Sequence, residues 1–206
     1  FEDSSVNRIR FTDSHVDVDL TGGTIRANRV VVATGVPGTL FKALTRHFTP
    51  RTVFAALTDD IPAKQRASVG VRDGLVTEVS EPPRHVEWAA EARVLTAGAE
   101  SAPVAPRQVA ATLVQRTGQL MYELSTLYPE ISGVLPARGW AIPFVRTSDG
   151  LPVAGPHRNY PRHLFVYAER DLSVTGAFLA SRLLLRHYTG SADRADDVFG
   201  FPRCLR

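Results

Sequence analysis

A run of four apolar residues, 30–33 (Val-Val-Val-Ala), constrains the fold of this chain more than any other feature. A continuous, mostly β-branched run is typical of a strand buried on both faces, as in a parallel sheet. The sequence Thr-Gly-Val-Pro-Gly follows at 34–38 and predicts a tight loop at the carboxyl end of that strand. We therefore expect a parallel strand here, in a fold of the α/β (α+β) class.

Shorter segments with alternating polarity lie before this run. Residues 6–11, 15–20 and 24–26 are separated by the turn-forming pairs Asp13-Ser14 and Gly22-Gly23. Such spacing is the pattern of hairpins, so the sequence predicts a small β-meander at the start of the chain. After the apolar run, 40–44 has room for about one helical turn before Pro50.

From residue 52 to residue 96 the pattern has period two. It predicts a mostly antiparallel sheet of about five strands. The segments expected to form these strands are 52–57, 67–71, 75–79, 85–88 and 93–96.

A long amphipathic helix is predicted next. Pro106 suits the first helical position, and the apolar residues that follow repeat at helical spacing until Pro129, so we expect their stripe to cover the sheet. Those residues are Val109, Leu113, Leu120, Leu124 and Leu127. Strands are then expected at 140–146 and 163–168, and a final helix at 174–188, ended by Gly190.

Composition excludes several classes of protein. With 206 residues, 44% of them hydrophobic and 22% charged, the chain has the balance of a globular protein. No apolar run approaches the roughly 20 residues of a membrane span and the amino terminus resembles no signal peptide, so no membrane partner and a cytoplasmic location are expected. The net charge is only +3 and the arginines are dispersed, which argues against nucleic acid as a partner.

Metal and disulfide chemistry are not expected either. Cys204 is the single cysteine, and the six histidines lack the spacing of metal ligands. The sequence also contains no G-x-G-x-x-G, P-loop, G-x-S-x-G or H-E-x-x-H motif.

Three stretches carry functional information, each with a structural alternative. In the first, Gly35 ends a buried strand, where open α/β sheets bind ligands, although strand-then-glycine is also ordinary turn chemistry. The second, T-S-D-G-L-P-V-A-G at 147–155, fits a functional loop or a structural turn. The third, S-V-T-G-A-F-L-A-S-R at 173–182, starts the last helix, where Ser173 or Thr175 would cap and Gly176 fits ligand approach or close helix-to-sheet packing.

Taken in order, these stretches resemble the D-amino-acid oxidase type of FAD-dependent oxidoreductase, particularly bacterial members acting on amines and amino acids. V-V-A-T-G at 31–35 matches the strand that returns to the flavin domain in that family. Segments 54–62 and 93–99 look like the first and last strands of its substrate-domain sheet, and the D-V-F-G-F-P-R tail at 197–203 also matches. The resemblance covers nearly the whole chain.

This resemblance implies that FAD is the cofactor and that the substrate is a small amine or amino acid. A hydride from the C–H beside the substrate nitrogen would pass to flavin N5, leaving an imine that water hydrolyses. Thr34 and Gly35 would lie near the ADP side, and the sheet would wall the substrate pocket. The residues implied near the flavin ring are Ser173, Val174, Thr175 and Gly176.

Trp140 and Arg146 are the candidates to line the substrate pocket. Structural packing for the tryptophan and ordinary surface charge for the arginine are the alternative interpretations. The sequence identifies no catalytic base.

Three parts are expected on this basis: residues 1–50 as the carboxyl-terminal part of an FAD-binding domain, 51–135 as the substrate-domain sheet and long helix, and 136–206 as the return to the FAD-binding domain. The family's G-x-G-x-x-G and βαβ unit do not occur, and the chain opens at Phe1 without an initiator methionine. We expect a missing amino-terminal FAD-binding segment, without which the chain does not hold flavin or turn over.

A second departure lies at 168–172, where Ala-Glu-Arg-Asp-Leu replaces the glycine- or histidine-bearing turn usual in the family. Bulkier, charged residues there would hinder the flavin ring. The alternative function is a non-catalytic subunit or binding module that completes a split oxidase.

Overall fold

The computed structural model describes residues 2–67, 69, 74–79, 83–89, 92–168 and 173–205. The chain forms two compact units. Unit 1 comprises Phe1–Pro50 together with Phe144–Arg206, and unit 2 comprises Arg51–Pro143.

The meander predicted at the start of unit 1 is confirmed. Strands β1 (Val6–Phe11), β2 (Val16–Leu20) and β3 (Gly23–Ala27) form an antiparallel sheet in the order β1-β2-β3. Cross-strand ion pairs join Arg10 to Asp19 at 2.9 Å and Arg26 to Asp17 at 2.8 Å.

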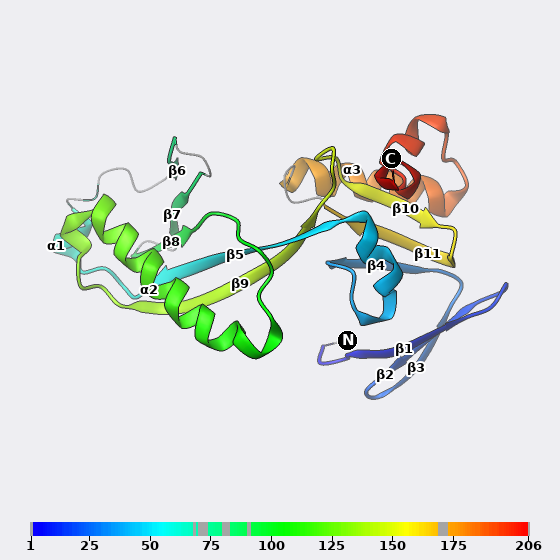
Figure 1. Ribbon diagram of the computed structural model, residues 1–206, viewed down its shortest axis with the longest axis horizontal. Coiled ribbons are helices and arrows are strands. Elements are labelled where there is room, and N and C mark those ends of the chain that lie inside the picture. Colours follow the sequence, from blue (N-terminus) through cyan, green and yellow to red (C-terminus); the bar gives the residue numbers. More distant parts are fainter. Residues whose placement is uncertain are drawn as a thin grey trace. The chain divides into compact units, whose positions relative to one another are not determined.

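A second three-stranded sheet of unit 1 has the order β10-β11-β4 (Figure 1). Strand β4 (Val30–Gly35) runs parallel to β11 (Tyr160–Tyr167), as predicted, and β10 (Val153–His157) is antiparallel to β11. The predicted burial of 30–33 on both faces is wrong in this chain, since Val32 is 5% exposed but Val31 is 53% exposed. The reason is that β4 is an edge strand, with β11 as its one neighbour in the described sheet.

Helix α3 (Ser173–Thr189) covers one face of this sheet. Ala180 and Leu183 pack against Ala154 of β10 and Val166 of β11. Gly190 follows the helix with φ of 75°, a left-handed conformation that glycine adopts without steric cost, so the predicted end of the helix is confirmed.

Short 3₁₀ segments complete unit 1: η1 (Thr39–His47), η5 (Arg194–Phe199) and η6 (Phe201–Leu205). The turn expected at 40–44 is thus longer, with a kink at Phe41. Phe41 and Phe201 pack with Phe165 and Tyr167 of β11 in a core rich in aromatic rings.

The sheet of unit 2 has five strands in the order β6-β7-β8-β5-β9 (Figure 1). Four of them agree with prediction: β5 (Thr49–Thr58), β6 (Leu75–Thr77), β7 (His85–Ala89) and β8 (Arg93–Ala97). The fifth is β9 (Pro136–Arg146).

No strand forms at 67–71 among the residues described there, which do not include 68 and 70–71. Helix α1 (Ala63–Arg66) lies just before, because Ala-Lys-Gln-Arg favours helix and the Gln65 and Arg66 amides donate to the Pro62 carbonyl.

Helix α2 (Val109–Leu127) is introduced by η2 (Pro106–Gln108) and followed by η3 (Pro129–Ile131). Leu120 packs on Phe54 and Ala56, so the apolar stripe covers the sheet as predicted along the middle of the helix. Val109 and Leu127, at its ends, are 37% and 52% exposed.

Candidate functional site

The carboxyl edge of the β4–β11 pair brings together part of the predicted cofactor site. The two strands run parallel with Gly35 opposite Tyr167, so both deliver their carboxyl ends to the same edge. Gly35 has φ of 71°, and no atom lies within 4 Å of where a Cβ would be, so the backbone is open to an approaching ligand. The exposed Thr34 donates its hydroxyl to the Val36 carbonyl at 2.8 Å, which fixes the loop after the strand.

The start of α3 follows this edge closely along the chain. Five residue steps join Ala168, at the end of β11, to Ser173, and an extended chain of that length spans at most about 18 Å. The first amides of a helix lack intrahelical partners and suit anionic or electron-rich groups. Thr175 is exposed, Val174 is 82% exposed and Gly176 is buried.

The residue that precedes this helix lies outside the described residues, so the expected cap by Ser173 or Thr175 stays a prediction. Helix α3 begins at Ser173, so both Ser173 and Thr175 lie inside it. The charged residues expected to hinder the flavin ring, which include Glu169 and Asp171, fall within 169–172, outside the described residues.

Ala168, immediately before that stretch, has an unusual backbone. Its φ is 60°, in the left-handed region that favours glycine, and the residue is only 6% exposed. The chain thus makes a sharp, glycine-like turn at the end of β11 although the residue there is alanine.

The 147–155 loop has a structural role. Arg203 pairs with Asp149 at 2.7 Å and also donates to the carbonyls of Leu151 and Pro152 at 2.6 and 2.9 Å. The hydrogen bond from Arg203 lowers the pKa of Asp149. Two of the stretches that carry the family resemblance, 147–155 and 197–203, therefore meet in one contact.

Gly155, the last residue of this loop, is explained by packing. Its φ is 140°, and a Cβ there would lie 2.9 Å from Nε2 of His187 on α3. A side chain at 155 would therefore require the His187 ring to move, in addition to the strain of the positive φ.

The two predicted pocket residues are both half-buried on β9. Trp140 and Arg146 are six residues apart, so the period of two places them on one face of the strand. Trp140 belongs to unit 2 and Arg146 to unit 1. Their role in substrate binding stays a prediction.

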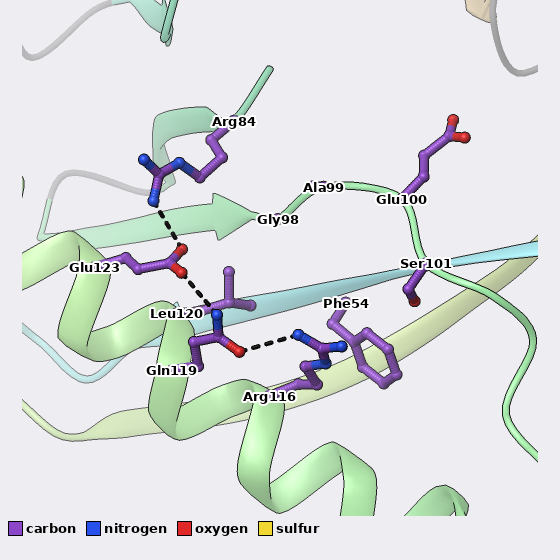
Figure 2. Close-up of a pocket in the computed structure, with 10 residues that line it drawn as sticks. All are labelled: Phe54, Arg84, Gly98, Ala99, Glu100, Ser101, Arg116, Gln119, Leu120 and Glu123. Atoms are coloured by element: carbon purple, nitrogen blue, oxygen red, sulfur yellow. Dashed lines mark hydrogen bonds and ion pairs between the residues drawn. The ribbon is translucent and has the colours of Figure 1, made fainter. Parts of the chain in front are cut away.

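A cavity of about 340 Å³ in unit 2 was not anticipated from the sequence. Figure 2 shows the row of polar side chains, mostly from α2, that lines this cavity. Arg84 contacts Glu123 at 3.1 Å, Gln119 donates to Glu123 at 2.9 Å, and Arg116 donates to Gln119 at 3.0 Å. Polar residues at helical positions 116, 119 and 123 are also the pattern of an ordinary solvent-exposed helix face, so the sequence alone does not indicate this cavity.

The polar groups of this cavity satisfy one another. Hydrogen bonds from the guanidinium to Glu78 and Glu123 raise the pKa of Arg84, and the Arg116 guanidinium lies 5.9 Å from the ring centroid of Phe54. A Cβ on Gly98 would meet Leu120 at 3.0 Å, so this glycine admits α2 close to the end of β8. The geometry is that of a network joining the β6–β7 hairpin to α2, and it presents no catalytic arrangement.

Across the described ranges, no group of three or more His, Cys, Asp or Glu side chains is placed to hold a metal ion. No helix in the same part of the chain is long and apolar enough to cross a membrane.

Comparison with known proteins gives fold likeness without sequence likeness. No family model matches the chain, and no curated protein matches it. Among solved structures, glycine oxidase from Geobacillus kaustophilus matches 94% of this chain with a TM-score of 0.62 at 20% identity. L-proline dehydrogenase from P. horikoshii matches 98% with a TM-score of 0.69 at 16% identity, and an Amadoriase I mutant from Aspergillus fumigatus matches 98% with a TM-score of 0.72 at 10% identity.

These likenesses establish the fold and its extent. The chain covers 50%, 54% and 49% of the three matched chains, so it spans about half their length. It has a mixed helix-and-sheet fold that corresponds to part of those proteins.

Proposed function

We propose that this chain is the carboxyl-terminal part of an FAD-dependent oxidoreductase that oxidises an amine or amino acid by hydride transfer to flavin. Unit 1 would be the remainder of the FAD-binding domain and unit 2 the substrate domain. The observation that carries the proposal is the open Gly35 edge beside the start of α3, within a fold shared with an oxidase and a dehydrogenase named for amino acids.

The residues present fit one part of the cofactor. Gly35 offers open backbone, and the first amides of α3 offer unpaired donors beside the exposed Val174. Flavin, when bound, supplies the hydride acceptor. The chain's own residues would orient it through Thr34, Gly35 and residues 173–176, while no glycine-rich cradle for the pyrophosphate occurs in the sequence.

An exposed apolar face of α3 supports the proposal that a further segment packs against this chain. Four side chains at helical spacing project from α3 on the side away from Ala180 and Leu183, and β4 is an open edge. Exposed apolar faces of this size mark contact surfaces. The four are Val174, Phe178, Leu185 and Tyr188, exposed by 82%, 68%, 53% and 57%.

The test is to compare chain 1–206 with a polypeptide in which a βαβ segment bearing G-x-G-x-x-G precedes it. We expect the isolated chain to be colourless and inactive with amines and amino acids even after FAD is added, since few contacts remain to offset the entropy of binding. The extended protein should retain flavin. A yellow preparation of the isolated chain would indicate bound flavin. It would overturn the expectation that the contacts in this chain are too few to hold the cofactor.

A matched pair of substitutions sharpens the test in the extended protein. Gly35→Val should reduce retained flavin strongly, because it fills the open edge. Gly190→Val at φ of 75°, beyond the other end of α3, imposes similar backbone strain away from that edge and should leave flavin content unchanged. Equal losses in both variants would attribute the effect to folding instead of the site.

The exposed α3 face also favours the alternative, a non-catalytic subunit that completes a split oxidase. Here flavin binding should be restored in trans by a separate short FAD-binding protein. Phe178→Asp should abolish that association, whereas Arg182→Asp, also exposed on α3, should not.

A further inference from the structure

A second cavity, of about 230 Å³, lies in unit 1 and has a concentration of basic side chains. Four of the residues that line it are arginine or histidine and none is acidic. The lining residues are Arg46, His47, Pro156, His157, Arg158, Phe201 and Pro202. We call it the His47–His157 cavity.

This cavity is at the edge of the sheet opposite to the candidate flavin edge. His157 ends β10 and pairs with Tyr160, at the amino end of β11. Gly35 pairs with Tyr167, at the carboxyl end of the same strand. A ligand in the cavity would therefore be separate from a flavin bound at Gly35.

The two imidazoles are buried and incompletely hydrogen-bonded. His47 is 4% exposed and neither ring nitrogen has a hydrogen-bond partner, while the His47 and His157 ring centroids are 5.4 Å apart. The Asn159 amide donates to Nδ1 of His157 at 3.2 Å. Because Nδ1 accepts, the neutral His157 ring carries its hydrogen on Nε2, which is then a donor.

The two arginines are exposed at the cavity rim. Within the described chain, neither Arg46 nor Arg158 has an ion-pair partner. Burial first, then the nearby His157, Arg46 and Arg158, lowers the pKa of His47. All four residues line the one cavity. No carboxylate among the lining residues competes for the donors.

We propose that the His47–His157 cavity binds a phosphate group, as inorganic phosphate or as a phosphomonoester. The guanidinium groups of Arg46 and Arg158 and the Nε2–H of His157 are the donors. Planar guanidinium forks match the oxygens of phosphate, and three donors from two separate segments, η1 and the end of β10, suit a tetrahedral anion better than a planar carboxylate. Pro156 and Phe201 supply apolar parts of the lining beside these donors.

Calorimetric titration of chain 1–206 with inorganic phosphate at pH 7.5 and constant ionic strength tests the proposal. Saturable binding is expected, and Arg46→Gln and Arg158→Gln should each weaken it roughly tenfold or more, as for loss of a charged hydrogen bond. Arg107→Gln, in η2 of unit 2, is the matched control and should bind as the parent does. Both cavity arginines are exposed, so these variants should fold, which circular dichroism checks.

Two further measurements identify the ligand. A glycerol phosphate that binds more tightly than inorganic phosphate would indicate a phosphomonoester, and equal affinity would indicate the inorganic ion. Imidazole proton resonances of His47 and His157 should shift on binding. Absence of saturable binding, equal affinity for acetate, or an equal loss in Arg107→Gln would overturn the proposal, and none of these results depends on flavin.

Discussion

The two units of the molecule differ in what fills their cores. Unit 1 is packed with rings: Phe165 has the centroids of Phe41, Tyr160 and Phe201 within 5.1 to 5.7 Å. The core of unit 2 is mainly aliphatic, and the buried polar side chains among its described residues are threonines. Its buried members include Ile61, Val86, Val94, Leu120, Leu124 and Ile131.

This difference implies different sensitivities. Aromatic rings pack edge to face with geometric preferences, and imidazoles in such a core must remain neutral to avoid burying a charge. His47, His157 and His163 are 4%, 6% and 1% exposed in unit 1. The stability of unit 1 should therefore depend on ring shape and pH, whereas that of unit 2 should depend mainly on buried apolar area.

The largest expected effect is from Phe165→Ala. Phe165 is fully buried, and its removal should lower the free energy of unfolding by about 3–5 kcal/mol. Hydrogen exchange should show the loss of protection concentrated in 2–50 and 144–205. Leu124→Ala, costing about 2–5 kcal/mol, should lose protection in unit 2 instead; a uniform loss in either variant would mean that the units unfold together.

A smaller loss should follow Arg203→Gln. The side chain is 13% exposed, and without it the Leu151 and Pro152 carbonyls lose their donor, so we expect about 1–3 kcal/mol in urea unfolding. Arg10→Gln breaks an ion pair whose arginine is 52% exposed and should cost less than about 1 kcal/mol. Equal costs would remove the structural role given to the 147–155 loop.

Mild acid should destabilise unit 1 gradually as the pH falls. Burial lowers the pKa of His47, His157 and His163, so each takes up a proton more readily when unfolded. Their contribution is therefore present above the unfolded pKa of about 6.5 and is lost as pH falls below it through the lowered folded values.

Both tryptophans, Trp88 and Trp140, lie in unit 2, so their fluorescence reports that unit during urea unfolding. Between pH 7.5 and 5.5, exchange protection corrected for intrinsic rates should fall in unit 1, with the tryptophan-detected midpoint changing less. A larger acid shift in the tryptophan signal would contradict the contrast between the cores.

Much of the fold was predictable because local signals agreed with tertiary packing. The hairpins of β1–β3, the parallel strand β4 and the boundaries of α2 follow from turn residues, β-branched runs and Pro106 and Pro129. The strand expected at 67–71 is not seen at residues 67 and 69, and residues 68, 70 and 71 lie outside the described residues. The preceding Ala-Lys-Gln-Arg favours a helical turn. The burial of Val31 failed because edge position depends on which strands are present, which no local pattern encodes.

The site was only partly predictable. Thr34, Gly35 and the start of α3 could be proposed from the sequence because glycine and helix starts have sequence signatures, and their role in binding flavin stays a prediction. The Asp149–Arg203 contact joins residues far apart in the chain, and the His47–His157 cavity collects side chains from η1, the β10–β11 turn and η6. Neither arrangement has a spacing that sequence periodicity could reveal.

The smallest expected effect, and the most specific to unit 1, is that of Ala168→Gly. Alanine at φ of 60° carries roughly 1 kcal/mol of left-handed strain that glycine would relieve. Glycine would also lose a buried methyl group, worth about 0.8 kcal/mol, and about 0.5–1 kcal/mol of chain entropy. These terms nearly cancel, so the free energy of unfolding should change by less than about 1 kcal/mol. Ala180→Gly, equally buried but inside α3, gains no relief and should cost about 1–2 kcal/mol. If Ala168→Gly were as destabilising as Ala180→Gly, the left-handed turn at the end of β11 would be wrong, and with it the view that this chain keeps a glycine-like turn before its last helix.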